Sequence, residues 1–338
     1  MSIETTFTFG TEVTFNSLTI VPLIGKPPAA NGIPGPSSSV ADYDTLDVAL
    51  ARGTLQITEV TESGRVPEIK VVNAGQRPVL IIDGEELVGA KQNRTVNLSI
   101  LIPPAADVIV PVTCVEAGRW SRQSRSFASS SRTHYAAGRA AKSAQVSESL
   151  RRDGVARADQ SQVWRAISEK SMRLGTSSAT AAMATMFEDH GQAVESFVAG
   201  LPVAAGQVGA VFILNGDAKG VDLFNSPETF RSLIPKILRG YALDAIDLTA
   251  KRASHAPSST DVTGARVTVA RQFMQLVLDA PRTPFAAPGI GETWRLYAPQ
   301  VSGGELAVNG NLVHLSAFGR ETTSDADSRR NAQSAARG

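Results

Sequence analysis

The residues best suited to chemistry lie within residues 77–125, where strand-like apolar runs alternate with polar clusters. The first cluster, residues 83–86, reads Asp-Gly-Glu-Glu. Its Glu85 is a candidate general base or metal ligand, because Mg²⁺ binds through one or two carboxylates together with substrate phosphates. Strand alternation sends Glu85 and Glu86 to opposite faces, so they do not share a site. The alternative explanation is a plain Asp-Gly turn with solvated glutamates.

Two further clusters offer donors and an aromatic ring. Residues 91–94 read Lys-Gln-Asn-Arg, and forked amide and guanidinium donors match phosphate or carboxylate oxygens. Glu116, Arg119 and Trp120 can hold a base or ribose, with Glu116 as a second candidate general base. Each cluster also has a structural explanation: an ordinary polar loop, and a buried ion pair with a core tryptophan. The predicted ligand-binding residues are Lys91, Asn93, Arg94, Arg119, Trp120 and Arg122.

A basic segment, residues 119–157, carries eight Arg and one Lys against two acidic residues. Such a segment suits phosphates, RNA or an acidic face of a neighbouring subunit. We expect at least one of Arg119, Arg122 and Arg125 to contact an anion, since they follow directly from a strand end. A solvated flexible arm is the alternative. RNA is not favoured, because no recognised RNA-binding motif accompanies the segment.

Several common catalytic signatures are absent from the sequence. There is no GxxxxGK[ST] phosphate loop, no HExxH and no GxSxG, and the glycines at 289 and 291 do not form a dinucleotide fingerprint. Cys114 is predicted to be a buried strand residue and not a nucleophile. His190 is predicted to be a core histidine, whereas His314 alternates with apolar neighbours and can face a site.

Composition sets broad limits on the class of protein. The 338 residues are 42% hydrophobic and 19% charged, with a net charge of +1, as in globular proteins with a sizeable core. One cysteine excludes an intrachain disulfide framework and fits a reducing, cytoplasmic location. The first residues lack the features of a signal peptide, and no apolar run has the length of a membrane helix.

The first half of the chain is predicted to be antiparallel β-structure. Residues 14–24 read as one strand, and residues 55–116 as a β-meander with an Asp83-Gly84 hairpin turn. About seven such strands favour a β-sandwich or a partly open barrel.

The second half is predicted to be helical and then mixed. Helices are expected at residues 161–174, 178–201, from Pro227 onward and 262–278, with a hairpin at Asn215-Gly216 and three final strands. The predicted class is therefore α+β. The predicted divisions are an antiparallel β region at 1–118, a basic Ser/Arg-rich loop at 119–142, a helical and mixed region at 143–320, and a disordered tail at 321–338.

Two long motifs, DGEELVGAKQNRTVN at 83–97 and PVTCVEAGRWSRQSRSF at 111–127, resemble the bacterial ARPP family. The name abbreviates "ARG and rhodanese-phosphatase-superfamily-associated protein", a domain of unknown function. The similarity extends through residues 149–164, 207–230 and 238–247. The positions carried over from the family motifs are Asp83, Glu85, Glu86, Lys91, Gln92, Asn93, Arg94, Glu116, Arg119, Trp120 and Asp222.

The resemblance implies little chemistry. The family name, however, refers to associated ADP-ribosylglycohydrolase-like and phosphatase-like proteins, which favours nucleotide or ADP-ribose-related ligands. We therefore predict a protein that binds a phosphorylated or nucleotide-like ligand, and the candidate bases leave processing of that ligand open. In this prediction Arg94, Arg119 and Arg122 hold phosphates, Trp120 stacks, and Glu85 or Glu116 acts as base or Mg²⁺ ligand. The alternative is a non-enzymatic homo-oligomer that docks through the basic segment.

Overall fold

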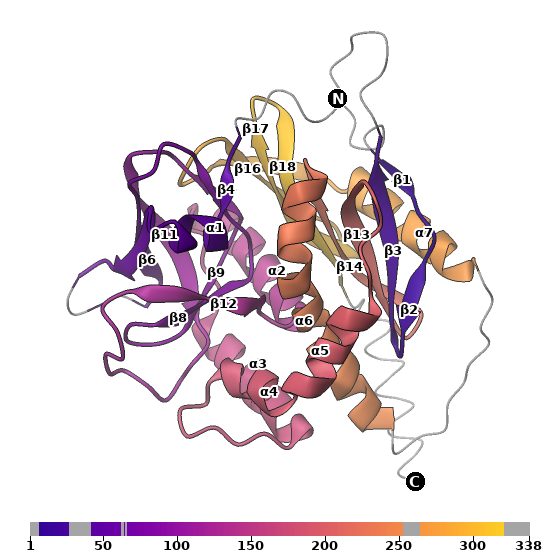
Figure 1. The fold of residues 1–338 in the computed structure, drawn as a ribbon, viewed down its shortest axis with the longest axis horizontal. Helices are drawn as coiled ribbons and strands as arrows, with labels where there is room; N and C mark the ends of the chain where they lie inside the picture. Colours follow the sequence, from indigo (N-terminus) through magenta and orange to yellow (C-terminus); the bar gives the residue numbers. More distant parts are fainter. Residues whose placement is uncertain (1–6, 27–41, 62–63, 65, 253–263, 321–338) are drawn as a thin grey trace.

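A computed structural model describes residues 7–26, 42–61, 64, 66–252 and 264–320. It confirms the α+β class, with β-structure and helices in both halves (Figure 1). The tail predicted at 321–338 lies outside the described residues.

The largest sheet of the described chain has nine strands, in the order β1-β3-β13-β14-β18-β17-β16-β15, with β2 paired to β3. Residues 14–24 are not one strand, because the chain turns at Asn16, whose φ is 53°. β3 pairs with β13, so residues of the predicted N-terminal β region belong to a sheet of the C-terminal half. The strands are β1 (Phe7–Phe9), β2 (Val13–Phe15), β3 (Leu18–Gly25), β13 (Gln207–Leu214), β14 (Asp217–Phe224), β15 (Arg282–Ala286), β16 (Glu292–Tyr297), β17 (Val301–Val308) and β18 (Asn311–Gly319).

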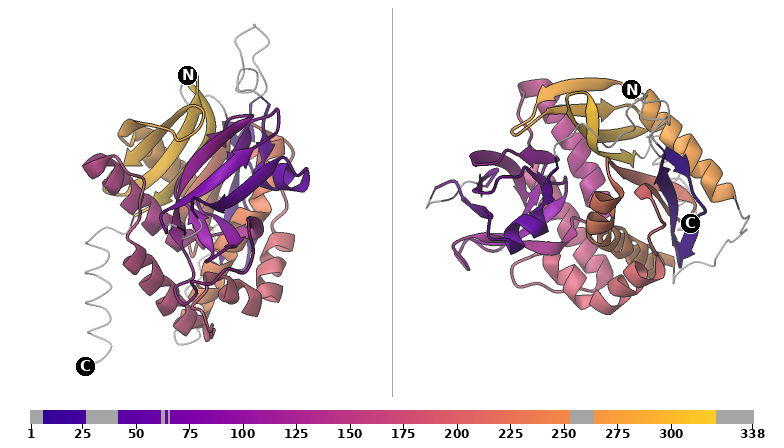
Figure 2. Two further views of the ribbon diagram at one scale, coloured as in Figure 1. Left: turned by 90° about the vertical axis from the view of Figure 1, so that its left-hand side faces the viewer. Right: turned by 45° about the horizontal axis from the view of Figure 1, so that its top comes forward.

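Both faces of this sheet are covered by helices, which is why strand β3 is apolar at successive positions. Ile20 and Phe212 face the core that contains helix α6, whereas Val21 and Val211 face helix α7. Figure 2 shows α7 on the outer side of the sheet and α6 on the inner side. The helices are α2 (Ala136–Asp153), α3 (Gln160–Leu174), α4 (Met183–Asp189), α5 (Gly191–Gly200), α6 (Pro227–Arg252) and α7 (Ala265–Asp279).

The N-terminal half contains two smaller sheets with their own apolar core. One sheet has the order β10-β7-β4 and the other β12-β8-β9-β11-β6-β5, so the predicted sandwich-like or barrel-like region is present. The elements are β4 (Asp44–Thr45), α1 (Leu46–Ala51), β5 (Leu55–Glu59), β6 (Glu68–Asn73), β7 (Val79–Ile81), β8 (Glu85–Gly89), β9 (Arg94–Val96), β10 (Ile100–Ile102), β11 (Ala106–Cys114) and β12 (Phe127–Thr133).

The hairpin predicted at Asp83-Gly84 is wrong. β7 pairs with β10 and β4, whereas β8 pairs with β9 and β12, so the chain crosses from one sheet to the other at this point. Gly84 has a φ of 82°, and a turn does close at Asp83-Gly84, where the Glu85 N–H donates to the Ile82 carbonyl at 3.2 Å. The N–H and the carbonyl of Gly84 itself bond to Val96 and His134, so the turn does not join two paired strands. The same residue types therefore serve a sheet-to-sheet connection.

The loop predicted at residues 119–142 is also corrected. Residues 127–133 form β12 on the edge of the six-stranded sheet, and α2 begins at Ala136. Arg132, Arg139 and Lys142 are not a solvated arm, because each forms an ion pair inside the protein. The helix predicted at 178–201 is two helices, α4 and α5, which meet at His190.

Candidate ligand-binding site

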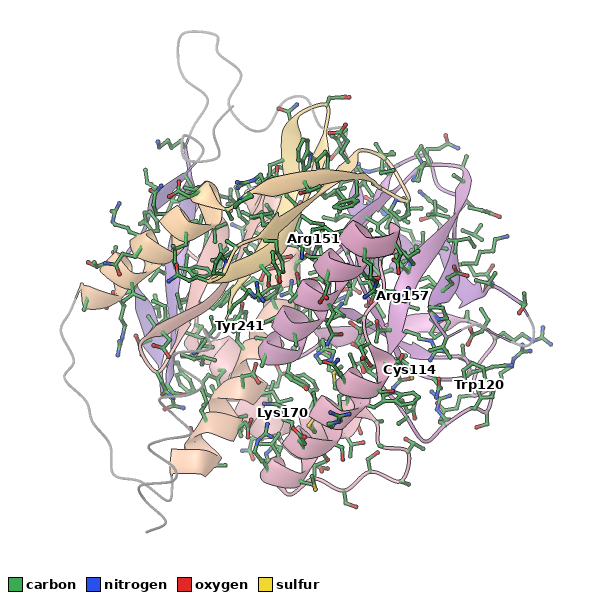
Figure 3. The ribbon with its side chains drawn as sticks, turned by 180° about the vertical axis from the view of Figure 1, so that it is seen from behind. Cys114, Trp120, Arg151, Arg157, Lys170 and Tyr241 are labelled. Atoms are coloured by element: carbon green, nitrogen blue, oxygen red, sulfur yellow. The ribbon has the colours of Figure 1, made fainter. Side chains whose placement is uncertain are left out.

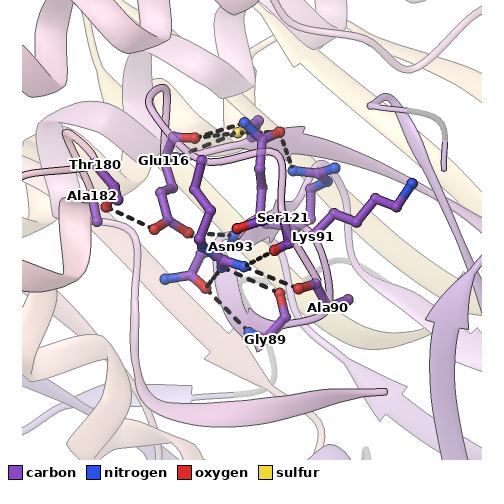
Figure 4. Close-up of polar contacts among 12 residues, drawn as sticks. Gly89, Ala90, Lys91, Asn93, Glu116, Ser121, Thr180 and Ala182 are labelled. Carbon is purple, nitrogen blue, oxygen red and sulfur yellow. Dashed lines mark hydrogen bonds and ion pairs between the residues drawn. The ribbon is translucent and has the colours of Figure 1, made fainter. Parts of the chain in front are cut away.

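Arg119 holds the turn after β8 against the segment after β11. Its guanidinium is buried, and Figure 4 shows how closely Gly89, Ala90, Asn93, Glu116 and Ser121 gather in this cluster. Nη1 and Nη2 together donate to the carbonyl oxygens of Gly89, Ala90 and Ser121, to Asn93 Oδ1 and to Glu116 Oε2. Arg119 and Asn93 therefore position the loops instead of presenting donors to solvent.

Glu116 is fixed from three sides. It accepts from Arg119 at 2.6 Å, from the Asn93 amide at 3.0 Å and from Thr180 Oγ1 at 2.8 Å. Burial opposes ionisation of this carboxyl, but these hydrogen bonds outweigh it and lower the pKa of Glu116. A carboxylate stabilised in this way is a weak general base, so the geometry favours a positioning role.

Arg94 lies beneath this loop cluster and is fully buried. Its Nη1 donates to Gln92 Oε1 at 2.9 Å, and the same oxygen accepts from Cys114 Sγ at 3.2 Å. Burial raises the pKa of the Cys114 thiol, although the charge of Arg94 acts in the opposite direction. Cys114 is thus a buried strand residue, as the sequence predicts.

A surface hollow of about 400 Å³ adjoins the cluster. The side chains around it include the cations Lys70, Arg122 and Arg125 and the acid Glu59. The full lining is Thr58, Glu59, Val60, Thr61, Lys70, Ala90, Arg122, Ser124 and Arg125. Sequence reasoning missed Glu59 and Lys70 because they come from β5 and β6, outside the polar motifs, and only strand pairing places them here.

Trp120 and Lys91 are not lining residues of this hollow, but Lys91 follows the lining residue Ala90 and Trp120 precedes Arg122 by two positions. The Trp120 side chain is 49% exposed, and Lys91 Nζ lies 5.3 Å from the centre of its ring. The Lys91 amide faces Glu59 Oε1 at 3.4 Å, which connects the tryptophan to the hollow. Figure 3 shows Trp120 at the edge of the molecule, with Cys114 farther inside. The core-anchor explanation of Trp120 does not hold.

Glu85 and Glu86 lie in two other environments. Both are completely buried, so the solvated-glutamate explanation is wrong. Glu85 pairs with Lys236 at 2.5 Å, and Glu86 pairs with Arg132 at 2.6 Å. Burial raises the pKa of both carboxyls despite these cations. Neither side chain lines the hollow, so the structure does not bring Glu85 together with the loop cluster.

An internal polar network joins the two halves of the protein. A hydrogen bond of 2.7 Å joins His314 Nδ1 and Ser99 Oγ. The other ring nitrogen of His314, Nε2, lies 3.2 Å from Asp222 Oδ1. Asp222 also pairs with Arg139 at 2.9 Å, and Asp83 pairs with Lys142 at 2.9 Å. Serine, histidine and aspartate in this order can activate a hydroxyl group. All three are buried here, however, so the network serves as an internal link.

A second hollow, of about 390 Å³, lies between β1 and α7. Half of its lining residues are apolar, Lys26 and Arg271 are its cations, and it contains none of the residues predicted from sequence. Among the described residues, no group of three or more His, Cys, Asp or Glu is arranged to hold a metal ion. The described helices include none that is long and apolar enough to cross a membrane.

Fold and site together define an α+β protein with a cation-rich surface hollow built on a buried polar motif. The model of the ARG and Rhodanese-Phosphatase-superfamily-associated Protein domain, ARPP-1, matches residues 6–318, and the chain belongs to this family. The predicted resemblance is thereby confirmed. No curated protein and no solved structure matches the chain.

Proposed function

We propose that this protein binds a small phosphorylated, nucleotide-like ligand in the hollow beside Trp120. The observation that carries the proposal is the convergence of Arg122 and Arg125 around one hollow of about 400 Å³, together with Lys70, whose ammonium also pairs with Asp107 at 2.6 Å. Guanidinium groups hold phosphate oxygens through paired N–H donors, and a lysine ammonium adds a point charge.

Two neighbouring groups favour a nucleotide over a bare anion. The Trp120 ring is half-exposed and offers a stacking surface to a base. Glu59 Oε2 is buried and has no hydrogen-bond partner among the described residues, so it can accept from ligand hydroxyl groups. The same carboxylate can hold a Mg²⁺ ion that accompanies the phosphates.

The geometry supports binding more than catalysis. Glu116 is occupied by Arg119 and Thr180, and Glu85 by Lys236, so neither predicted catalytic carboxylate faces the hollow. The alternative of an assembly protein that docks through a basic arm has less support. Much of that segment is built into β12 and α2, and its Arg132 and Arg139 are ion-paired internally.

Thermal unfolding with ADP-ribose, NAD and ADP, with and without Mg²⁺, tests the proposal. A ligand at about 100 times its Kd stabilises the native state by about 2.7 kcal/mol and raises the Tm. The double variant Arg122→Ala/Arg125→Ala should lose the shift. Arg231→Ala, which removes an exposed arginine of α6, should keep it. If none of the ligands stabilises the wild-type protein, the proposal is wrong.

A further inference from the structure

Arg94 is a buried cation whose hydrogen-bonding capacity is only partly used. Its side chain is 0% exposed, yet Nε and Nη2 have no hydrogen-bond partner among the described residues. The carboxylate within ion-pair distance is Glu59, whose Oε1 lies 3.9 Å from Nη2, beyond hydrogen-bond length. Burial lowers the pKa of Arg94, and the neighbouring Cys114 and Glu59 only partly offset this cost.

Buried donors without partners are rare because each loses its hydration and gains nothing in return. A guanidinium makes this loss larger, since its charge is also desolvated. The acceptor next to it is unsatisfied as well, because Glu59 Oε2 has no donor within the part of the chain that the structure describes. Unsatisfied N–H donors of Arg94 and an unsatisfied carboxylate oxygen of Glu59 therefore lie close together, where Arg94 borders the hollow that Glu59 lines.

Trp120 covers this boundary. Arg94 Cζ lies 5.7 Å from the centre of the indole ring, and Lys91 Nζ lies 5.3 Å from it. The contrast in exposure is large, since the ring is 49% exposed and the arginine beneath it is not exposed at all. A half-exposed side chain changes rotamer on a fast timescale without disturbing the core. Rotation of Trp120 alone would thus open a path from the hollow to Arg94.

We propose that Arg94 is a second anion-binding position beneath Trp120, and that the ligand is a diphosphate that spans from Arg122 and Arg125 to Arg94. This inference rests on the proposed function and deepens it by naming the phosphate chain. One phosphoryl group contacts the exposed arginines that line the hollow. The other displaces the Trp120 ring and accepts from the open N–H groups of Arg94. A monophosphate reaches only the first position.

Inorganic phosphate and pyrophosphate distinguish the two positions without contributions from a base. Pyrophosphate should bind at least about tenfold more tightly than phosphate, and only pyrophosphate should change the tryptophan fluorescence. The chain has three tryptophans, and the change should disappear in Trp120→Phe. Trp120→Ala removes the cover, so it should tighten pyrophosphate binding about threefold or more. Arg94→Lys should weaken pyrophosphate binding by a larger factor than phosphate binding.

The outcomes separate the two proposals. If neither anion binds the wild-type protein, the proposed function fails and this inference fails with it. If pyrophosphate binds and Arg122→Ala/Arg125→Ala abolishes binding, but Trp120 is silent and Trp120→Ala has no effect, only this inference is wrong. The Trp120 variants make this decision even if Arg94→Lys does not fold, because Trp120 is a surface residue.

Discussion

Arg139 and Asp222 form a two-pronged ion pair in the centre of the protein, with N–O distances of 3.1 and 2.9 Å. Arg139 comes from α2 and Asp222 from β14, so the pair fixes the helix onto the large sheet. Burial opposes ionisation, yet the charge and hydrogen bonds of Arg139, together with His314, lower the pKa of Asp222 to about 2. Both side chains are completely buried, and the pair is therefore charged without access to water.

Removal of one partner should be much worse than removal of both. Arg139→Met leaves an uncompensated buried carboxylate and should lower the free energy of unfolding by about 3 to 5 kcal/mol. Arg139→Met/Asp222→Leu should cost less than the sum of the two single variants, as urea unfolding can measure. Arg231→Met, at an exposed site of α6, should change stability by no more than about 0.5 kcal/mol. Additive single-variant effects would contradict this account.

Stability should fall when the solution is acidified below neutral pH, because of His134. Burial, and then the charge of Lys142, lower the pKa of His134 from 6.5 to about 3, with Arg139 adding to the effect and Asp83 opposing it. In the unfolded chain His134 is protonated as the pH falls through about 6.5, whereas in the native state it is protonated only near pH 3. The contribution of this group to stability is present above pH 6.5 and is lost as the pH falls from there toward 3.

Between pH 7 and pH 5 the expected loss from His134 is about 2 kcal/mol. Urea unfolding at both pH values measures it. His134→Gln cannot take up the proton and should show a correspondingly smaller decrease over the same interval. Equal pH dependence in the wild type and the variant would rule out a neutral, buried His134 as the cause.

Arg119→Lys should destabilise the loop cluster although the charge is kept. A single ammonium cannot reach the five acceptors that the guanidinium reaches from Nη1 and Nη2. We expect a loss of about 2 to 4 kcal/mol in unfolding free energy, and weaker ligand binding because Arg122 and Arg125 lie on the segment that Arg119 fixes. Arg125→Lys, an exposed substitution, is the matched control for stability. A neutral Arg119→Lys variant would argue against its positioning role.

Gly84→Ala tests the connection between the two N-terminal sheets. Gly84 has a φ of 82°, and a Cβ atom there would lie 2.6 Å from Arg139 Cδ. The backbone strain and the displaced arginine should together cost about 2 kcal/mol or more. Gly154→Ala has a similar φ of 73° with nothing within 4 Å, so it should cost only about 1 kcal/mol. Differential scanning calorimetry of both variants separates the clash from the strain.

The sequence by itself determined the α+β class, the helices α3, α6 and α7, and the family. Hydrophobic periodicity is a local signal, and the buried faces of α6 and α7 follow it because Phe230, Ile234 and Ile237, and Phe273 and Val277, repeat at helical spacing. The hairpin predicted at Asn215-Gly216 is also present, because β13 and β14 are adjacent along the chain and pair with each other. The buried position of Cys114 followed from its apolar strand.

Only the tertiary structure decided what the polar motif contacts. The Asp83-Gly84 pair has the composition of a hairpin turn, but the pairing of β7 with β10 and of β8 with β12 made it a crossing between sheets. Glutamate is usually a surface residue, so the sequence suggests that Glu85 and Glu86 are exposed. Their burial depends on ion pairs with Lys236 and Arg132, which lie far along the chain. The hollow beside Trp120 likewise needed Glu59 and Lys70 from other strands. Ion pairs and surface hollows form between distant segments, so no local pattern encodes them.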